Sequence, residues 1–476
     1  MKIKADHILV LFITFLLGNL FVLNLNAINV EIKQQKSNFL YGAQATITGD
    51  ITRQNGDFFP WKGNAEMAWN TYISADEKYD IYLIAGVHDD SKNLQLQFIS
   101  GNTSFDFTIQ PTTGWVGNGM NFQRIKIGSA ISFQKGEQKL VIKSSGITGD
   151  KILFNFRSVE LVPLAALPAI EKERKKAEAS RADTEWLVKK SYGLMFHWTS
   201  QSVNADGSNK PYEQAVNEFD VVQFANMVEE TGAGYVIFTI GHAEQYCPAP
   251  IKSWEKCHPG KTTKRDLIRE IADELNKKDI LFICYLHSLG TARFRTQNNN
   301  DFFNTFDDIL SEIGNRYKKS LSGYWFDCWY QIFEGYPDIP FEKFYKITKK
   351  GNKNRIICLN SWVYPSVSPW QDYWAGETAS PIAIPVNGFL KEGPVTDLRY
   401  QVLLVMEPYW VQEKAEMPEP RFSSKQLVDY INSCSENGGA VTVNMGIYQN
   451  GKVGEKALQV MREVKEQIRF TKKQSF

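Results

Sequence analysis

The sequence predicts a two-domain protein, in which an N-terminal β-sandwich of the jelly-roll type precedes an α/β barrel of the (β/α)8 type. Residues 28–163 show strand-like alternation of apolar and polar residues with frequent turn signals, a pattern typical of β-sandwiches. From residue 187 to 470, apolar strand-like runs alternate with helical patterns, which indicates a parallel barrel. Residues 164–186 are charged, with alanines interspersed, so we expect a helical linker between the two domains.

The N-terminus has the pattern of a secretory signal peptide, which we assign to residues 1–27. Two lysines precede an apolar stretch from Ile8 to Leu25, and Ala27 provides a small residue for cleavage. We therefore expect an exported protein, periplasmic or extracellular, with no stable membrane insertion after cleavage. Because the apolar stretch is long for a signal peptide, an uncleaved membrane anchor is the alternative.

Charge and composition narrow the range of partners. A formal net charge of +1 gives no electrostatic reason to bind nucleic acid. Aromatic residues make up 13% of the chain, which suits surfaces that stack on sugar rings, although a large aromatic core accounts for much of this content. In the predicted sandwich, core packing is the competing role for each candidate for sugar stacking, namely Phe58, Phe59, Trp61, Trp69 and Trp115.

The individual elements follow from the spacing of apolar residues. In the first domain, the predicted strands include residues 79–84, 94–98, 140–142 and 152–161. In the second domain, the predicted strands are residues 193–198, 235–240, 280–286, 323–327, 355–359 and 440–444. The helices predicted between them are residues 221–230, 264–277, 303–317, 341–349, 424–436 and 454–468. The irregular stretch 362–420 should hold one or two further strands.

The predicted strand 323–327 ends on a carboxylate, Asp327, with Trp325 before it and Trp329 after it. A carboxylate at the end of a buried strand is unfavourable unless it is paired or functional, and the C-terminal strand ends of a barrel form its active-site face. Aromatic rings beside a carboxylate suit a sugar ring, which develops positive charge during hydrolysis. The alternative is a carboxylate that caps a core strand.

Polar residues recur where the other predicted barrel strands end. Histidines stand at three of these ends, as His197, His242 and His287. Because the strand ends of a barrel share one face, three histidines beside carboxylates and aromatic residues favour a polar pocket for a hydroxylated ligand.

Five segments in this order resemble the motifs of glycoside hydrolase family 29, the α-L-fucosidases. The resemblance extends from about residue 191 to residue 468. The segments that carry it are Gly193-Leu194-Met195-Phe196-His197-Trp198, Thr239-Ile240-Gly241-His242, Lys264-Arg265-Asp266-Leu267, Trp325-Phe326-Asp327 and the run from Asn437 to Gly446.

The resemblance implies an exo-glycosidase that removes terminal α-L-fucosyl residues from glycans with retention of configuration. Asp327 is then the nucleophile, and a second carboxyl group about 5 Å away is the general acid/base. Glu377 is the first choice for this second group and Glu407 is the second choice, followed by Asp372 and Glu244. No metal ion or other cofactor is expected.

The resemblance also assigns the substrate-binding residues. His197 and His242 match family residues that bind sugar hydroxyls, and His287 is placed by its strand end to contact the substrate. The residues expected to wall the pocket are Trp198, Tyr246, Trp325 and Trp410.

The segment after the second barrel strand departs from the family pattern. The family has two adjacent histidines there, whereas His242 is followed by Ala243, and Glu244-Gln245-Tyr246 replaces an Asp-Gly-Phe sequence. Loss of a hydroxyl donor removes about 1–3 kcal/mol of binding free energy. The same fold and mechanism acting on another α-L-glycoside, or on an internal fucan-type linkage, is therefore an alternative. A further alternative is an inactive carbohydrate-binding protein.

The cysteines leave two structural alternatives open. Cys247 and Cys257 lie in one loop, and an exported protein can form a disulfide there. A zinc site from His242, Cys247, Cys257 and His258 is the other alternative, although the spacing matches no standard ligand pattern. The sequence does not indicate the oligomeric state.

Overall fold

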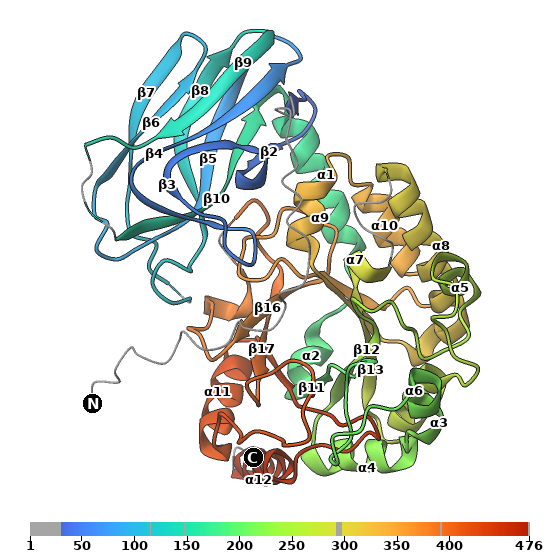
Figure 1. Ribbon diagram of the computed structural model, residues 1–476. Helices are drawn as coiled ribbons and strands as arrows, with labels where there is room; N and C mark the ends of the chain where they lie inside the picture. The colour runs from blue at the N-terminus through green and yellow to red at the C-terminus, as the bar shows by residue number, and fades with distance from the viewer. Residues whose placement is uncertain are drawn as a thin grey trace.

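The computed structural model describes residues 30–114, 116–146, 149, 151–291, 298–390 and 393–474. Figure 1 shows an all-β N-terminal domain beside a larger α/β domain. The predicted signal peptide and Trp115 lie outside the described residues. Within those residues, no helix has the length and apolar character needed to cross a membrane.

Ten strands form the N-terminal domain. They are β1 (Val30–Ile32), β2 (Asn38–Tyr41), β3 (Thr46–Ile51), β4 (Phe59–Ile73), β5 (Glu77–Val87), β6 (Leu94–Ser100), β7 (Thr103–Ile109), β8 (Gln123–Phe133), β9 (Gly136–Lys143) and β10 (Ile152–Pro163), with the 3-10 turn η1 (Gly42–Gln44) after β2. All are hydrogen-bonded into one sheet in the order β7-β6-β9-β4-β10-β5-β8, and β1, β2 and β3 pair with β4 or β10. The domain is thus a continuous sheet around one core, and not two separately bonded sheets.

Most of the aromatic candidates for sugar stacking belong to this core. Phe59, Trp61 and Trp69 are each at most 1% exposed. The indole N–H of Trp61 donates to Ser144 Oγ at 2.8 Å, and that of Trp69 donates to the Tyr41 carbonyl at 2.8 Å. These contacts replace the hydrogen bonds that the indoles lose on leaving water. These three residues are therefore core residues, as the core-packing interpretation predicted, and Phe58 alone among the described candidates stays partly exposed.

A helical connection follows β10 and packs against the α/β domain. It consists of η2 (Leu164–Ala166), α1 (Leu167–Ser180) and α2 (Glu185–Lys189). The indole N–H of Trp370 donates to Glu173 of α1 at 2.9 Å, and the hydroxyl of Tyr345 donates to the Ser180 carbonyl at 2.9 Å. The connection is thus a part of the α/β domain's surface layer.

Eight parallel strands form the sheet of the α/β domain. They are β11 (Tyr192–Phe196), β12 (Tyr235–Gly241), β13 (Leu281–His287), β14 (Gly323–Asp327), β15 (Ile356–Leu359), β16 (Tyr373–Ala379), β17 (Arg399–Val405) and β18 (Ala440–Asn444). Their order is β15-β14-β13-β12-β11-β18-β17-β16, and every barrel strand predicted from the sequence is among them. The irregular stretch contributes β16 and β17.

The first and last strands of this order come together, so the sheet is barrel-like. The backbone N–H of Asp372, just before β16, donates to the Ile357 carbonyl of β15 at 2.9 Å. The Asp372 carboxylate accepts from the backbone N–H of Ile357 at 2.7 Å and from Lys349 Nζ at 2.6 Å. Asp372, a third-rank candidate for the acid/base, is therefore a structural carboxylate that joins the two strands.

Helices follow most strands and cover the outside of the sheet (Figure 1). Capping residues begin several of them, and Asp220, Asp266 and Ser423 each accept a backbone N–H at their helix N-terminus. The helices are α3 (Tyr212–Glu218), α4 (Val221–Thr231), α5 (Lys252–Cys257), α6 (Leu267–Lys277), α7 (Ser288–Thr291), α8 (Asn299–Tyr317), α9 (Trp329–Gly335), α10 (Phe341–Thr348), α11 (Ser424–Glu436) and α12 (Glu455–Gln474), with the short turns η3 (Lys318–Ser320) and η4 (Val386–Gly388).

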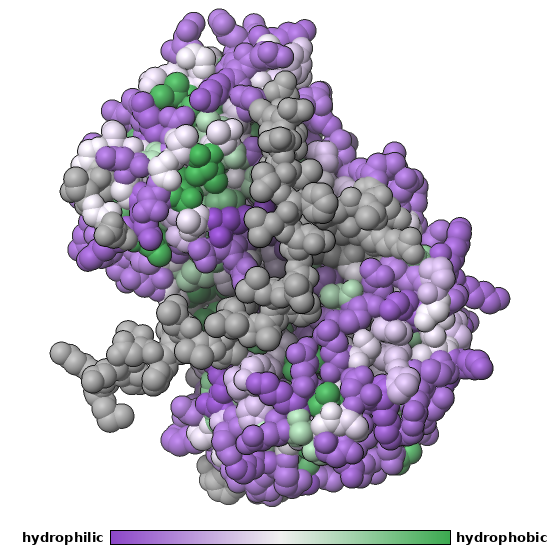
Figure 2. All heavy atoms as spheres, viewed as in Figure 1, coloured by the Kyte–Doolittle hydropathy of each residue, from purple (hydrophilic) through white to green (hydrophobic). Residues whose placement is uncertain are grey.

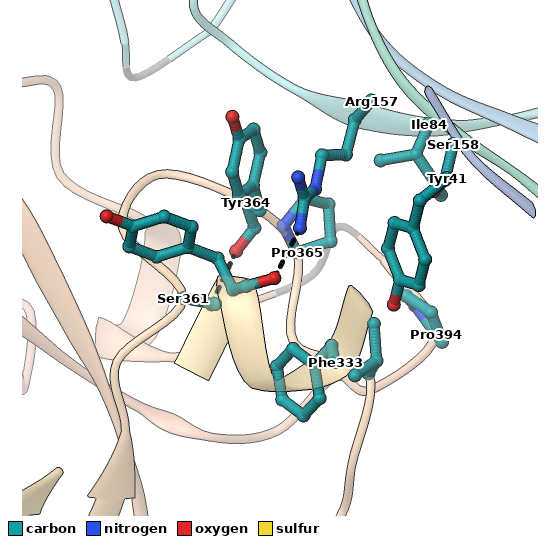
Figure 3. Close-up of a pocket in the computed structure, with 11 residues that line it drawn as sticks. Tyr41, Ile84, Arg157, Ser158, Phe333, Ser361, Tyr364, Pro365 and Pro394 are labelled. Carbon is teal, nitrogen blue, oxygen red and sulfur yellow. Dashed lines mark hydrogen bonds between the residues drawn. The ribbon is translucent and has the colours of Figure 1, made fainter. Parts of the chain in front are cut away.

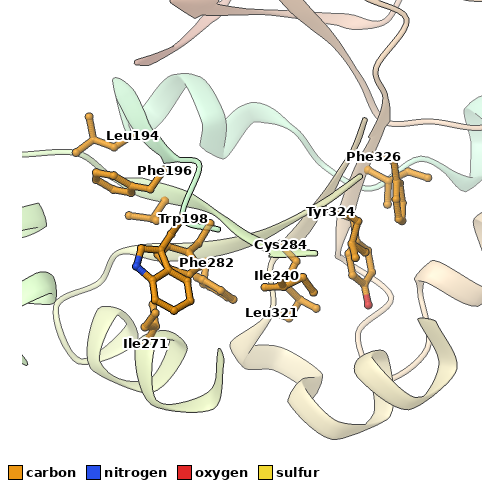
Figure 4. Close-up of a cluster of buried hydrophobic side chains, with 14 of the residues drawn as sticks. Leu194, Phe196, Trp198, Ile240, Ile271, Phe282, Cys284, Leu321, Tyr324 and Phe326 are labelled. Atoms are coloured by element: carbon orange, nitrogen blue, oxygen red, sulfur yellow. The ribbon is translucent and has the colours of Figure 1, made fainter. Parts of the chain in front are cut away.

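Alternate residues of each strand point to opposite faces of the sheet, which gives this domain two cores. The outer core lies between sheet and helices, and Figure 4 shows a part of it, with Phe196 of β11, Phe282 of β13 and Phe326 of β14. The inner core includes Met195, Tyr285 and Trp325. The last inward residue of each strand therefore faces the mouth of the sheet, and these positions build the site.

Arg157 of β10 joins the two domains. Its side chain is buried, donates to the Asp57 carbonyl at 2.6 Å and the Tyr330 carbonyl at 2.7 Å, and forms an ion pair with Glu334 of α9. Its guanidinium also lies 4.5 Å from the ring centroid of Tyr364. Figure 3 shows this arrangement beside a pocket of about 20 Å³, a volume that holds about one water molecule.

The face seen in Figure 2 is mainly hydrophilic, with hydrophobic residues in small separate groups. The large hydrophobic side chains that are exposed in the described residues are scattered over both domains, as Tyr72, Leu167, Val222 and Tyr409. Single exposed apolar residues of this kind are normal for a protein surface.

Candidate active site

Asp327 ends β14 and faces the mouth of the sheet, where its side chain keeps part of its surface open to solvent. Its Oδ1 accepts the backbone N–H of Cys328 at 2.7 Å and the side-chain amide of Asn360 at 2.8 Å. Its Oδ2 accepts the hydroxyl of Tyr285 at 2.5 Å. Three donors therefore hold this carboxylate in one orientation.

The same surroundings keep Asp327 ionised. Burial by itself raises the pKa of this carboxyl, but His287 and the hydrogen bonds from Tyr285 and Asn360 outweigh it and lower the pKa below its usual value. Hydrogen bonds to the charged form of a carboxylate stabilise that form. Asp327 is thus an anion that is fixed in place at neutral pH.

Glu377 of β16 is the second carboxyl group of the site. Its Oε2 accepts from the side-chain amide of Asn360 at 2.5 Å, the same nitrogen that donates to Asp327 at 2.8 Å. The two carboxylate oxygens are therefore at most about 5.3 Å apart, the sum of these distances. Retaining glycosidases have their two carboxyl groups about 5–5.5 Å apart.

The surroundings of Glu377 shift its pKa in the opposite direction from that of Asp327. Burial and, after it, the negative charge of Asp327 together raise the pKa of Glu377 to about 8. Glu377 is therefore protonated at neutral pH while Asp327 is ionised. Two carboxyl groups whose surroundings separate their pKa values in this way suit a general acid beside a nucleophile.

His197 and His287 contribute neutral imidazoles. Burial, together with the neighbouring His242, lowers the pKa of each of them to about 4. The Nδ1 of His197 lies 2.7 Å from Asn444 Oδ1, so Nδ1–H donates a hydrogen bond to the amide oxygen and Nε2 is left as an acceptor. A neutral imidazole of this kind can accept a hydrogen bond from a sugar hydroxyl.

Aromatic and acidic groups complete the pocket around these histidines. The ring of Trp410 lies 5.2 Å from that of His197, and His242 lies 5.2 Å from His287, measured between ring centroids. The Nδ1 of His242 is 3.2 Å from a carboxylate oxygen of Glu244. The arrangement thus offers an anion, a protonated acid and hydroxyl-binding groups in one cavity mouth.

A comparison with family models assigns the chain that carries this site to a family. The α-L-fucosidase model matches residues 173–471, more than half of the chain. The chain belongs to the α-L-fucosidase family. This confirms the resemblance to glycoside hydrolase family 29, and the protein is a glycoside hydrolase.

Solved fucosidase structures are similar to this chain at low identity. An α-L-fucosidase from Bacteroides thetaiotaomicron is 18% identical, with 61% of this chain and 74% of that chain covered and a TM-score of 0.46. One from Paenibacillus thiaminolyticus is 17% identical, with coverages of 62% and 76% and a TM-score of 0.47. One from Lactobacillus casei, in complex with α-L-fucose, is 16% identical, with coverages of 60% and 98% and a TM-score of 0.43. No curated protein matches the chain.

Two of the residues predicted to wall the pocket lie elsewhere in this fucosidase-family protein. Trp198 is 1% exposed in the outer core, where its ring stacks on Phe238 and its indole N–H donates to the Gln449 carbonyl at 3.0 Å (Figure 4). Tyr246 packs against Tyr212 with ring centroids 4.7 Å apart. Trp198 thus belongs to the outer core and Tyr246 packs against it, and we correct their assignment to structural positions.

Trp325 and Glu407 lie close to the site without facing it in the predicted way. Trp325 is 1% exposed in the inner core and stacks under Tyr285 at 5.3 Å, so it supports the pocket floor. Glu407 is buried and accepts the backbone N–H of Gly446 at 2.8 Å. Burial raises the pKa of Glu407 to about 7, but the amide that joins Asp327 to a second carboxyl group donates to Glu377 and not to Glu407.

The structure also decides between the alternatives for the loop that contains Cys247 and Cys257. Cys247 is a buried thiol outside any disulfide, so no Cys247–Cys257 bond is present. The zinc site from His242, Cys247, Cys257 and His258 does not assemble. Among the described residues, the potential metal ligands that do come together are His287, Asp327 and Cys328, whose ligand atoms lie within 4.8 Å of one another. Asp327 is already held there by protein donors.

Three supporting residues were missed by sequence reasoning as parts of the site. Asn360, Tyr285 and Asn444 each hydrogen-bond a site residue. All three lie at or near a strand end: Tyr285 pairs with Trp325, Asn444 pairs with Met195, and Asn360 directly follows β15. The period-two alternation of side chains along a strand is the signal that could have identified them.

Proposed function

We propose that the protein is a retaining, exo-acting α-L-fucosidase that removes terminal α-L-fucosyl residues from glycans. Asp327 is the nucleophile and Glu377 is the general acid/base. The single observation that carries this proposal is the Asn360 amide, which donates to both carboxyl groups and keeps their oxygens within about 5.3 Å.

In the first step, a carboxylate oxygen of Asp327 forms a bond to the anomeric carbon while the bond from that carbon to the leaving oxygen breaks. Glu377 gives its proton to the leaving oxygen. In the second step, Glu377 takes a proton from water, the water oxygen bonds to the anomeric carbon, and the ester to Asp327 breaks. Two inversions give net retention.

The proposed intermediate changes Glu377 from an acid into a base. The negative charge of Asp327 contributes to the raised pKa of Glu377, and this charge disappears when Asp327 becomes an ester. The pKa of Glu377 then falls, which favours the carboxylate that activates water. One group thus serves both steps.

His197, His242 and His287 bind the sugar, and Trp410 is the partly exposed aromatic wall. We further propose a closed (β/α)8 barrel over residues 187–470, a 28–163 sandwich domain and a 164–186 linker. We also propose that the protein is exported and that residues 1–27 are cleaved as its signal peptide.

A panel of aryl glycosides tests the activity and its sugar. We expect hydrolysis of 4-nitrophenyl α-L-fucoside, with the α-anomer of fucose appearing first in proton NMR spectra. Faster hydrolysis of the α-L-galactoside would move the specificity to another α-L-glycoside, a change that Ala243 in place of a family histidine favours. Binding of fucose without hydrolysis of any substrate in the panel would leave only a binding protein.

The pKa values of the two carboxyl groups predict a bell-shaped pH profile of kcat/KM. Asp327 must be ionised, so activity appears as pH rises through its lowered pKa, below the usual 3.8. Glu377 must be protonated, so activity is lost as pH rises through about 8. In Glu377→Gln, assayed with an activated aryl fucoside, the alkaline limb should disappear. An unchanged alkaline limb in that variant would assign it to another group.

A further inference from the structure

We propose that the N-terminal domain completes the subsite for the leaving group of the substrate, where Phe58 and Trp362 form a two-domain stacking platform for the sugar next to the fucosyl residue. This inference rests on the proposed hydrolase function and adds to it a role for the N-terminal domain.

The two domains meet at loops that directly follow the reacting groups. An aromatic cluster at this contact contains Phe58 and Phe122 from the N-terminal domain and Tyr330, Trp362 and Tyr364 from the α/β domain. Tyr330 lies three residues after Asp327, and Trp362 two residues after Asn360. The N-terminal domain therefore contacts the rim of the catalytic pocket and not its base.

Trp362 is connected to the catalytic pair through Asn360. Its backbone N–H donates to Asn360 Oδ1 at 3.0 Å, which orients the other end of that amide toward Asp327 and Glu377. Trp362 has a φ of 57°, a left-handed conformation that a non-glycine residue adopts only when its surroundings impose it. Its ring is thus held at the rim by the backbone that also positions the two carboxyl groups.

Phe58 gives the tryptophan ring its partner from the other domain. The two rings stack with centroids 5.8 Å apart and an interplanar angle of 28°. Both side chains remain partly exposed, unlike Phe122 and Tyr364 in the same cluster. The hydroxyl of Tyr364 donates to the Gly56 carbonyl at 2.6 Å, so the segment that carries Phe58 is fixed to the α/β domain.

The direction of the chemistry places the leaving group at this platform. The leaving oxygen must contact Glu377, since Glu377 protonates it, and the rest of the leaving group extends beyond that carboxyl. Tyr330, three residues after Asp327, packs in the same aromatic cluster and is partly exposed. Partly exposed aromatic faces at this point suit the apolar C–H face of a hexose.

The test compares two substrates that share the fucosyl residue and differ in the leaving group. α-L-Fucosyl fluoride has no leaving-group sugar, whereas 2′-fucosyllactose presents two. In Phe58→Ala we expect kcat/KM for 2′-fucosyllactose to fall roughly fivefold to tenfold, mainly through KM, as for loss of one stacking contact. The value for the fluoride should stay within about twofold of wild type.

Two variants separate stacking from folding. Phe58→Leu keeps apolar volume at the domain contact but removes the aromatic face, so it should show the same substrate difference with an unchanged melting temperature. Tyr72→Ala removes an exposed aromatic side chain (39% exposed) from β4 of the same domain, and should change neither substrate.

The outcomes distinguish the subsite from the activity on which it rests. Equal loss on both substrates in Phe58→Leu, or no loss on 2′-fucosyllactose, would overturn the subsite while the fucosidase activity stands. Wild-type protein that hydrolyses neither substrate would overturn the proposed function together with its subsite.

Discussion

Replacing Asp327 by Asn is expected to lower kcat/KM for 4-nitrophenyl α-L-fucoside by at least about 10⁴-fold, the scale seen when a catalytic nucleophile is removed. The amide has nearly the same shape as the carboxylate but cannot form the glycosyl ester. Tyr285, Asn360 and the Cys328 N–H, which all donate to the carboxylate, would then face an amide that provides a weaker acceptor. Initial rates with the aryl fucoside measure the loss.

Covalent labelling provides the control for this result. A 2-fluoro-fucosyl fluoride should add one fluorofucosyl mass to the wild-type peptide that contains Asp327, and none to the same peptide of Asp327→Asn. The melting temperature should show that the variant is folded. If Asp327→Asn keeps near-normal activity, or if the label appears on another carboxylate, the nucleophile has been assigned to the wrong residue.

Replacing Glu377 by Ala is expected to lower kcat/KM by about 10²–10⁴-fold for substrates with poor leaving groups, the usual contribution of general acid catalysis. Fucosyl fluoride and a 2,4-dinitrophenyl fucoside need little protonation, so their first step should be much less affected. Azide should restore turnover of the activated substrate and form an α-fucosyl azide, because a small anion can enter the space left by the side chain, can attack the fucosyl-enzyme in place of water and needs no base.

Glu407→Ala is the matched comparison for Glu377→Ala. Both residues are acidic, and burial raises the pKa of each. Glu377 belongs to β16, and Glu407 follows the neighbouring strand β17. Glu407 accepts the backbone N–H of Gly446, whereas the Asn360 amide donates to Glu377. Loss of the Glu407 side chain should therefore lower the stability of the fold more than it changes how kcat/KM depends on the leaving group. Azide rescue in Glu407→Ala, with none in Glu377→Ala, would transfer the acid/base role to Glu407.

Strand alternation explains why some site residues were predictable and why one was misplaced. Asp327 stood out because a carboxylate ended an apolar run. At the end of β11, Phe196 and Trp198 both belong to the outer core, whereas His197 between them contacts Asn444 of the site. The sequence motif alone grouped His197 with Trp198, although a period of two separates them. Applying that period along the whole strand would have assigned Trp198 to the core.

The position of Glu377 was harder to predict from residue pattern. The strand that carries it, Tyr373–Ala379, has Gly376, Glu377 and two alanines among its seven residues in place of an apolar β-branched run, so its propensity for strand is weak. The family resemblance suggested Glu377, and the amide of Asn360 shows why that position works. No local pattern encodes this contact, which joins residues on two strands at opposite ends of the sheet order.

The contact between domains has even less sequence signal. Arg157 and Glu334 are 177 positions apart, and each looks like an ordinary charged residue in its own segment. The aromatic candidates of the first domain were likewise indistinguishable in sequence, although Trp61 is fully buried and Phe58 lies at the rim. Only the docking of one domain on the other separates these roles.

The buried Arg157 also limits how this enzyme can be cut or recombined. A truncated α/β domain would lose the cation that pairs with Glu334 and would present Val363 and Tyr364 to water. Leaving one member of a buried ion pair without its partner costs about 3–5 kcal/mol. The catalytic domain is therefore not a portable module, and chimaeras of this protein need to inherit both halves of the chain together.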